Sequence, residues 1–427
     1  MIAIYMFFTS LTLLLVGIPV AFVFGGVALI FAFFVPDVGL GIFNVLPFRI
    51  FGIMSNTTLM AVPLFILMGL ILEKSGMAQK LLISMSSLFR SVKGGLAISV
   101  ILVGAMLAAS TGIVSASVVM MSVIALPLMI KAGYDRSLSS GVIASSGTLG
   151  QIIPPSIILI ILGDVMSVSV GELFLGAVLP GVLLVGLYIL YIVVLAYLKP
   201  EMVPAFKSDE EVDYIEAFKA ILPPLLLMFT VLGSIFSGVA SATESAAFGV
   251  VGALILSLFN KTISKEMISY TLSESIKLSG MIFMILIGAT AFSLVFNELG
   301  GTDIVVDFFS KDIADVWVFI VVAMLSIFIL GFFIDFIEIS FIIVPILVPV
   351  VEAFGIDPIW FAVLIAMNLQ ASFLTPPFGL ALFFLKGSSK NMLTTMQIYK
   401  GVVPFILLQL VALGLVIAFP ILVFAFI

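Results

Sequence analysis

The chain contains no cysteine and no histidine, and only 9% of its 427 residues are charged. The absence of cysteine excludes disulfides, thiolate nucleophiles and cysteine-ligated metal sites. The absence of histidine removes the side chain that most often shuttles protons or binds metals. The sequence has no glycine-rich phosphate loop and no basic patch, which disfavours an ATP-driven pump and a nucleic-acid partner. The remaining chemistry has to come from carboxylates, hydroxyls, amides and the backbone.

Hydrophobic residues make up 63% of the chain, and apolar runs long enough to cross a bilayer recur from one end to the other. This pattern predicts an all-α polytopic membrane protein, since a membrane β-barrel would show short segments of alternating hydrophobicity. The first apolar run, residues 1–34, has no basic n-region and no small-residue cleavage site. We therefore expect it to be part of the structure and not a signal peptide.

One stretch of sequence occurs twice, 222 residues apart, and each copy carries a proline pair inside an apolar segment. The first copy covers residues 145–155 and ends at Pro154-Pro155, and the second covers residues 367–377 and ends at Pro376-Pro377. The same offset aligns three further pairs without a gap: Pro127 with Pro349, Gly133 with Gly355, and Asp135 with Asp357. Paired, proline-interrupted membrane segments in two halves of a chain indicate the binding site of a transporter.

The charged residues cluster in loops, and loops at equivalent positions carry opposite signs. The loop with Lys74, Lys80, Arg90 and Lys93 is basic, so the positive-inside rule places it in the cytoplasm. Its counterpart, residues 298–315, is rich in Asp and Glu and is expected outside. Two further pairs of loops also reverse: Lys131 and Arg136 against Glu352 and Asp357, and Asp164 and Glu172 against Lys386 and Lys390. Reversed loop charge in two related halves predicts inverted structural repeats.

The short distance between two basic loops indicates a re-entrant hairpin. Lys93 and Lys131 are both expected in the cytoplasm, yet two full spans between them would need about 20 residues each plus a turn. We therefore predict an inner hairpin at 94–130 and, by the repeat, an outer hairpin at 317–351. Each hairpin precedes a broken helix with a proline pair, at 137–163 and 358–385. Non-helical backbone at this depth requires surrounding protein or a wet cavity.

The remaining segments complete the two halves. We expect a first inverted repeat at 1–198, a cytoplasmic linker at 199–219 and a second inverted repeat at 220–427, with both termini outside. Residues 38–56 are mixed in character and are expected to lie along the membrane surface. The other expected helices cover residues 2–16, 18–34, 59–72, 173–198, 220–236, 239–258, 280–296 and 402–427.

Small and hydroxyl-bearing residues concentrate at the first hairpin tip, residues 108–117, and at the break that follows it. Proline cannot donate a hydrogen bond and displaces the carbonyl one turn earlier. Freed carbonyls and Ser or Thr hydroxyls are hard oxygen ligands that suit Na⁺, whereas the N-terminal ends of half-helices suit an anion. Close helix packing is the competing explanation for each small residue. The duplication of the whole arrangement favours a functional role.

Three acidic residues stand out from the apolar background. Asp335 falls at the tip of the outer hairpin, and Glu338 follows one turn later. Carboxylates at membrane depth are costly, so they are candidates for cation binding, proton transfer or the capping of a helix end. Glu244 follows Ser241 and Thr243 at an expected helix start, which favours a structural capping role for this acid.

Several motifs carry a resemblance to a known family. They are Ala109-Ser110-Thr111-Gly112, Gly147-Thr148-Leu149-Gly150 with Pro154-Pro155-Ser156, Thr243-Glu244-Ser245-Ala246-Ala247, and Thr375-Pro376-Pro377. Together they resemble the large membrane subunit of TRAP transporters, the tripartite ATP-independent periplasmic family. The resemblance covers essentially the whole chain, and it rests on the set of motifs because a proline pair alone is a weak signal.

The resemblance implies an elevator-type fold of the ion-transporter superfamily, with a transport domain and a scaffold in the bacterial cell inner membrane. It implies Na⁺-driven uptake of an organic acid anion, with a periplasmic substrate-binding protein and a small four-helix membrane subunit as partners. One Na⁺ site would lie between hairpin tip and broken helix in each half. The first would use Ser110, Thr111, Gly147, Gly150, Ile153 and Pro155, and the second Gly331, Asp335, Ser372, Thr375 and Pro377. The candidate substrate contacts are Ser145, Thr148, Asn368 and Gln370.

Other functions fit the sequence less well. A self-sufficient ion-coupled carboxylate transporter, which needs no binding protein, is the main alternative within the same class. An intramembrane hydrolase would need an activated nucleophile or a metal site, and without Cys and His only carboxylate or Ser–Lys chemistry is left. A passive channel would show a ring of charges or a filter sequence. We therefore expect a transporter subunit and not an enzyme.

Overall fold

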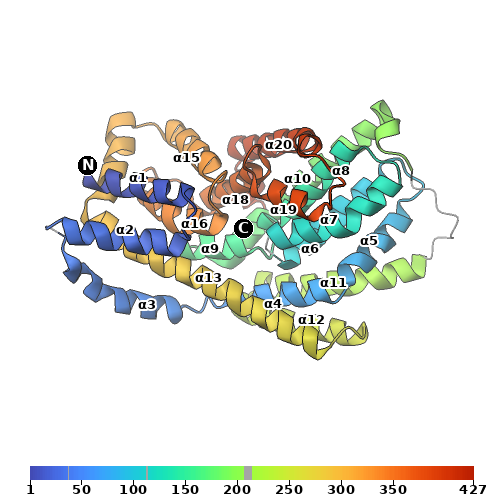
Figure 1. Ribbon diagram of the computed structural model, residues 1–427, viewed down its shortest axis with the longest axis horizontal. Helices are drawn as coiled ribbons and strands as arrows, with labels where there is room; N and C mark the ends of the chain where they lie inside the picture. The colour runs from blue at the N-terminus through green and yellow to red at the C-terminus, as the bar shows by residue number, and fades with distance from the viewer. Residues whose placement is uncertain (37, 112–113, 206–213) are drawn as a thin grey trace.

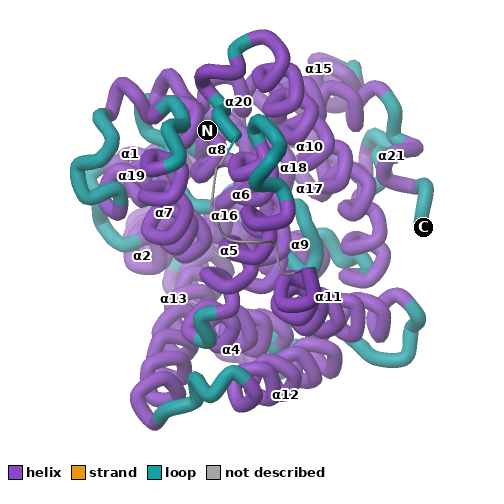
Figure 2. The backbone as a smooth tube through the Cα atoms, turned by 90° about the vertical axis from the view of Figure 1, so that its right-hand side faces the viewer, coloured by secondary structure: helices purple, strands orange, loops and turns teal. Residues whose placement is uncertain are grey.

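The computed structural model describes residues 1–36, 38–111, 114–205 and 214–427, and these residues form helices joined by loops (Figure 2). No β-strand occurs among them. Within these ranges, seven helices are long and apolar enough to cross a membrane, or eight if the bent pair α4 (Ala61–Lys74) and α5 (Met77–Leu88) is one span. The prediction of an all-α polytopic membrane protein is confirmed.

The first half begins with two short helices and ends with a long one. Its elements are α1 (Ile2–Leu15), α2 (Val20–Phe34), η1 (Leu40–Val45), α3 (Leu46–Met54), α4, α5, α6 (Gly95–Thr111), α7 (Val114–Lys131), α8 (Arg136–Thr148), η2 (Leu149–Gln151), α9 (Ile157–Val165) and α10 (Val170–Leu198). The short helix η3 (Pro200–Met202) follows in the segment between the halves.

The second half follows this segment and also contains a long helix near its end. Its elements are α11 (Tyr214–Phe236), α12 (Ala242–Phe259), α13 (Lys265–Glu298), α14 (Gly301–Asp307), η4 (Phe308–Ile313), α15 (Val316–Leu330), α16 (Phe336–Glu338), η5 (Ile339–Ile343), α17 (Val344–Ala353), α18 (Pro358–Leu374), α19 (Leu380–Ser388), α20 (Thr395–Ala418) and α21 (Ile421–Phe424).

Local signals for helix initiation recur at the offset seen in the sequence. α8 and α18 each begin after an aspartate, Asp135 and Asp357, whose carboxylate accepts a hydrogen bond from a backbone N–H of its own helix at 2.8 and 2.9 Å. The glycines two residues before these caps, Gly133 and Gly355, have positive φ angles of 84° and 63°. Glycine adopts this conformation without the steric cost that a Cβ atom brings. Equivalent signals therefore start the two broken helices, 222 residues apart.

Three helix lengths differ from the expected ones. α13 starts at Lys265 and not near residue 280, because the polar segment before the apolar run is also helical and is capped by Ser264. α11 starts at Tyr214, inside the segment expected to be linker. α20 ends at Ala418 instead of continuing to residue 427, since Pro420 follows and starts a separate turn. Hydropathy detects the apolar part of a helix and misses its polar extension.

The helices form two groups that both views separate. α4, α11, α12 and α13 lie on one side of the molecule, and α8, α10, α18 and α20 lie on the other (Figures 1 and 2). The backbones of α8 and α20 approach very closely, because a Cβ atom built on Gly401 would lie 1.8 Å from the backbone oxygen of Ser137. Small residues that let backbones touch are typical of packed membrane helices. The broken helix α8 is thereby fixed against α20.

We predict that Gly401→Ala destabilises the protein, whereas Gly414→Ala on the same helix does not. At Gly401 the new methyl group would overlap backbone that cannot move aside, and such overpacking costs about 1–3 kcal/mol or more. At Gly414 no described atom lies within 4 Å of the new methyl group. Thermal unfolding of the purified variants in detergent measures the difference. Equal midpoints for the two variants would contradict the close α8–α20 contact.

Candidate functional site

Each proline pair interrupts a helix, and the first pair is buried whereas Pro377 of the second pair is exposed. α8 and η2 lead to Pro154-Pro155, and α18 leads to Pro376-Pro377; both Pro–Pro peptide bonds are cis. Residues 138–152 and 360–374, which precede the two breaks, are all buried. Because proline has no N–H and displaces a preceding carbonyl, each break leaves backbone oxygens that its helix cannot use. The surrounding protein keeps these polar groups away from lipid.

The two broken helices meet at equivalent positions. Gln370 Nε2 on α18 lies 3.5 Å from Thr148 Oγ1 on α8, and both side chains are fully buried. The two residues are 222 positions apart. In a two-fold arrangement, equivalent residues that touch each other lie at the line where the two halves meet. The first and the second copy of the sequence motif are therefore brought together in space.

Candidates for the second cation site lie side by side. Gly331 follows the last turn of α15, and a methyl group at this position would lie 2.2 Å from Ser372 Oγ on α18. Thr375 ends α18 one turn after Ser372. Pro377 is exposed, and its carbonyl accepts a hydrogen bond from the Tyr399 hydroxyl at 3.1 Å, so it stands at the edge of this group.

The hydroxyls of this group are oriented by the helix. Ser372 Oγ donates to the carbonyl of Leu369 at 2.8 Å, and Thr375 Oγ1 donates to that of Ala371 at 2.9 Å. A carbonyl can only accept, so each hydroxyl hydrogen is used and only oxygen lone pairs remain. These oxygens can ligate a cation or accept an N–H. They are therefore better suited to bind Na⁺ than to bind a carboxylate anion.

The two acids of the outer hairpin have different surroundings. Asp335 caps α16, and its carboxylate accepts from the Phe336 N–H at 2.7 Å. Glu338 is 7% exposed, and its Oε2 atom has no hydrogen-bond partner among the described residues. The sequence left cation binding, proton transfer and helix capping open for these acids. For Asp335, the structure shows helix capping.

The first cation site is described only in part. The side chains of Ser110 and Thr111, and residues 112–113 of the hairpin tip, lie outside the described residues. Gly147 packs against the second hairpin helix, where a Cβ atom would lie 2.5 Å from a methyl group of Val118 on α7. Gly150 and Pro155 are buried, and Ile153 is half-buried with its N–H bonded to the Leu149 carbonyl. These last three residues lie along the first break.

The candidate substrate contacts are all buried, and most of them already make hydrogen bonds. Ser145 and Thr148 donate to carbonyls of α8, at 3.2 and 2.9 Å. Asn368 donates to the Met324 carbonyl at 2.6 Å and so ties α18 to the hairpin helix α15. Gln370 Oε1 has no partner in the described part of the chain. A carboxylate substrate needs donors, and these hydroxyls offer acceptors.

Gln151 is a residue that the sequence reasoning missed. It lies in η2 at the first break, it is 1% exposed, and neither its Nε2 nor its Oε1 has a partner within the described residues. Buried polar groups are normally paired, so these two atoms are candidates for contact with a ligand. Its position inside the repeated stretch, three residues before the proline pair, was visible in the sequence, but its burial was not.

Glu244 has the structural role that the sequence favoured. Ser241 caps α12, and the Glu244 carboxylate accepts from the Ser241 N–H at 2.8 Å, which completes a capping box. Thr243 takes no part in the cap, because its hydroxyl donates to the Thr57 carbonyl at 2.6 Å. The capping prediction for this acid is confirmed.

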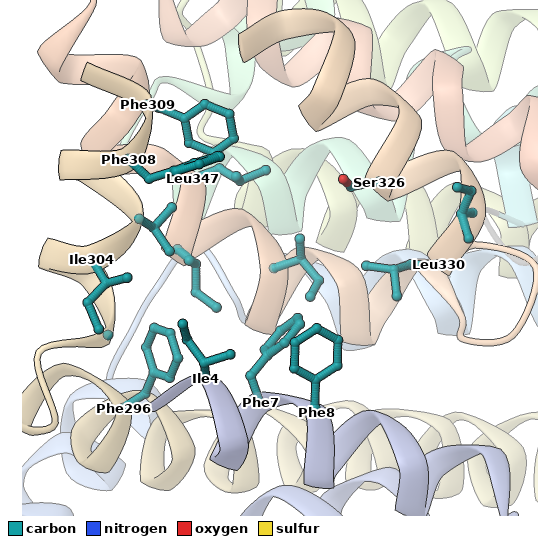
Figure 3. A pocket seen from close by; sticks show the side chains of 15 residues that line it. Ile4, Phe7, Phe8, Phe296, Ile304, Phe308, Phe309, Ser326, Leu330 and Leu347 are labelled. Atoms are coloured by element: carbon teal, nitrogen blue, oxygen red, sulfur yellow. The ribbon is translucent and has the colours of Figure 1, made fainter. Parts of the chain in front are cut away.

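An apolar cavity of 740 Å³ lies apart from the two breaks. It is enclosed by α1, the end of α13, α14, η4, α15 and α17, and Phe7 and Phe8 face Phe308, Phe309 and Leu347 across it (Figure 3). None of the candidate cation or substrate residues lines it. Its walls offer an anion neither a charge nor a set of donors, so it does not compete with the breaks as the substrate site.

Broken helices that meet inside a bundle of apolar helices define a membrane transport protein. Comparison with known proteins identifies the family: the model of the tripartite ATP-independent periplasmic transporter, DctM component, matches residues 7–422. The chain belongs to this family of large TRAP permease subunits. It is therefore a multi-pass protein of the bacterial cell inner membrane and a transporter component, not an enzyme.

Several relatives are similar over most of their length. The chain is 31% identical to the C4-dicarboxylate TRAP transporter large permease protein DctM of Pseudomonas aeruginosa over 79% of each chain. It is 29% identical to the ectoine permease protein TeaC of Halomonas elongata over 96% of each chain. It is also 29% identical to the sialic acid permease protein SiaM of Vibrio cholerae, over 97% of this chain and 95% of that protein.

A solved structure shares the fold at low sequence identity. The YdaH transporter of Alcanivorax borkumensis superposes with a TM-score of 0.66 and 14% identity, over 96% of this chain and 99% of that one. At this identity the likeness concerns the fold alone. It agrees with a membrane transporter architecture.

We predict that Gly331→Ala disturbs the contact between the outer hairpin and α18, because the new methyl group would overlap Ser372 Oγ. The variant should lose about 1–3 kcal/mol of stability. Ser372→Gly removes the two atoms that would lie within 3 Å of the methyl group, so the double variant should recover much of that loss. A double-mutant cycle on thermal unfolding measures the coupling. Additive effects of the two substitutions would contradict the contact.

Proposed function

We propose that this chain is the large permease subunit of a Na⁺-coupled transporter that imports an organic acid anion. A periplasmic binding protein delivers the substrate, and a small four-helix membrane subunit extends the scaffold. The halves 1–198 and 220–427 act as inverted repeats, each with a hairpin and a broken helix. The contact between Thr148 and Gln370, which brings the two breaks together in a TRAP permease, is the observation that carries this proposal.

The chemistry of the breaks supports Na⁺ as the coupling ion. Ser372 and Thr375 keep only lone pairs for a ligand, and backbone carbonyls at the proline pairs add further oxygens. Oxygen ligands of this kind match a hard cation. Ser110 and Thr111 would supply the corresponding hydroxyls in the first half.

Unpaired amide groups near the breaks support an anionic substrate. The Gln151 side chain has a free donor, and the half-helices α9 and α19 begin just after the proline pairs. The N-terminal ends of helices favour negative charge. A carboxylate held by these donors would sit beside the cation sites, which links the binding of the two solutes. The named substrates of the relatives, C4-dicarboxylates, sialic acid and ectoine, all carry a carboxylate.

An elevator mechanism divides the helices into two bodies. The transport domain contains α6–α10 and α15–α20, and the scaffold contains the remaining helices, including α4, α11, α12 and α13. A polar contact joins the two bodies, because Asn56 Nδ2 before α4 donates to Asp164 Oδ1 on α9 at 2.5 Å. This contact would have to break when the transport domain moves.

A self-sufficient carrier that needs no binding protein is the runner-up. Substrate uptake distinguishes the two functions when the chain, its small subunit and the cognate binding protein are reconstituted in liposomes with a panel of organic acids. We expect uptake to require both an inward Na⁺ gradient and the binding protein. Na⁺-dependent uptake without the binding protein would favour the runner-up, and proton-driven uptake without Na⁺ would reject the cation sites.

We predict that Thr375→Val raises the Na⁺ concentration needed for half-maximal uptake by about tenfold, the effect of losing roughly 1.4 kcal/mol of ligand interaction. Valine keeps the shape of threonine and removes the oxygen. Thr290→Val is the matched control, because the Thr290 hydroxyl makes the same bond to a carbonyl four residues earlier but lies on the scaffold helix α13. Equal Na⁺ dependence in the two variants would contradict a cation site at Thr375.

Cross-linking tests the motion of the transport domain past the scaffold. Because the chain contains no cysteine, the introduced pair supplies its only thiols. We predict that a short bifunctional thiol reagent blocks uptake in the Asn56→Cys/Asp164→Cys variant, because it joins scaffold and transport domain. Thr57→Cys/Thr243→Cys is the control, since both residues lie in the scaffold and line one pocket. Complete cross-linking of the first pair with unchanged uptake would reject the movement of one body past the other.

A further inference from the structure

Two apolar cavities occupy equivalent places in the two halves. The 740 Å³ cavity lies between α1, η4 and α15 with further walls from α13, α14 and α17, and a second cavity of 530 Å³ lies between α11, α5 and α6 with a further wall from α10. At the 222-residue offset, α1 corresponds to α11, α14 to α5 and α15 to α6. Phe7 in the first cavity and Phe229 in the second are equivalent residues. The two cavities therefore have three pairs of equivalent helices in their walls, and the second cavity also touches the first break through Ile153 and Pro154.

The walls of both cavities are apolar. Among the described residues that line the first, Ser326 is the one polar side chain, and its hydroxyl is the single oxygen drawn in Figure 3. Among the described residues that line the second cavity, none has a polar side chain. They include Ala105, Ile153, Pro154 and Val182. An apolar cavity stays free of water, so its natural occupant is another apolar group.

Both cavities open toward the hydrocarbon of the bilayer. Phe8 and Phe308 line the first cavity and are 59% and 49% exposed, and Val182 and Phe229 line the second and are 61% and 70% exposed. Since this is a multi-pass membrane protein, exposed apolar side chains on these helices face lipid. The volumes lie within the range of about 300–1,000 Å³ that is typical of small-molecule sites.

Each cavity has walls from both proposed bodies. In the first, α1, α13 and α14 belong to the scaffold, and α15 and α17 to the transport domain; in the second, α5 and α11 face α6 and α10. A protein segment fixed in this place would tie the bodies together. A fluid hydrocarbon chain fills the space without linking the two bodies. It can leave and return as the helices that line the cavity move.

We propose that each cavity holds an acyl chain of a bilayer phospholipid, one from each leaflet, at the interface along which the transport domain slides. The leaflets follow from the loop charges: the acidic segment of α14 and η4 is expected outside, and the basic loop after α5 inside. The sliding role rests on the proposed function. The binding of the chains does not, because it depends only on the shape and chemistry of the cavities.

Photo-cross-linking tests the binding. The chain in nanodiscs of phosphatidylethanolamine and phosphatidylglycerol would receive a phospholipid with a diazirine near the end of its acyl chain, and mass spectrometry would map the adducts. We expect adducts on the cavity faces of α1 and α15 and of α11 and α6. Ser326→Trp fills the first cavity and Ala105→Trp the second, so each variant should lose adducts at its own cavity and keep those at the other.

The outcome of the photo-cross-linking experiment shows whether lipid or protein occupies each cavity. Adducts that persist beside a filled cavity, or that are no more frequent there than on the exposed face of α12, would overturn the proposal. Adducts that disappear when the small subunit is added would show that protein covers the cavity, which also overturns it. Ser326→Leu and Ala105→Leu repeat the test with less bulk if a Trp variant does not fold. Slower uptake in variants that lose adducts supports the sliding role, and unchanged uptake rejects that role alone.

Discussion

In hydrocarbon every backbone N–H and C=O has to be bonded inside the protein, and the arrangement of this molecule depends on that constraint. The two proline pairs remove backbone bonds in the middle of α8–α9 and α18–α19. Such breaks are tolerated only where protein or a wet cavity surrounds them, and residues 138–152 and 360–374, which lead to the two breaks, are buried. The remaining helices therefore bury the segments that lead to the two breaks, and Gly401 lets α20 pack directly on α8.

The need for hydrogen-bond partners inside the protein also determines which polar groups near the breaks stay available to a ligand. Hydroxyls such as those of Ser145, Ser372 and Thr375 donate to helix carbonyls and leave lone pairs free. Donors for an anion have to come from amide groups, and Gln151 provides an unpaired one. Oxygen lone pairs suit a cation and amide donors suit an anion, and the proposed coupled transport requires both.

Packing differs within and between the two proposed bodies. Within the transport domain, glycine permits close packing: Gly401 lies against the backbone of Ser137, and Gly331 lies against the side chain of Ser372. Between the bodies lie two apolar cavities and a polar contact from Asn56 to Asp164. A tightly packed body beside a loosely filled interface is the arrangement that permits one part to move past the other, and lipid chains would keep that interface filled.

The sequence alone determined the all-α membrane class, the 222-residue repeat and the capping role of Glu244, because hydropathy and capping are local. It missed the polar extension of α13, since hydropathy detects only apolar runs. Tertiary structure decided which residues meet: Thr148 with Gln370, Gly331 with Ser372, and Asn368 with the α15 backbone. It also decided the burial of Gln151 and the paired cavities. These depend on how helices from distant parts of the chain pack, and no local pattern encodes that.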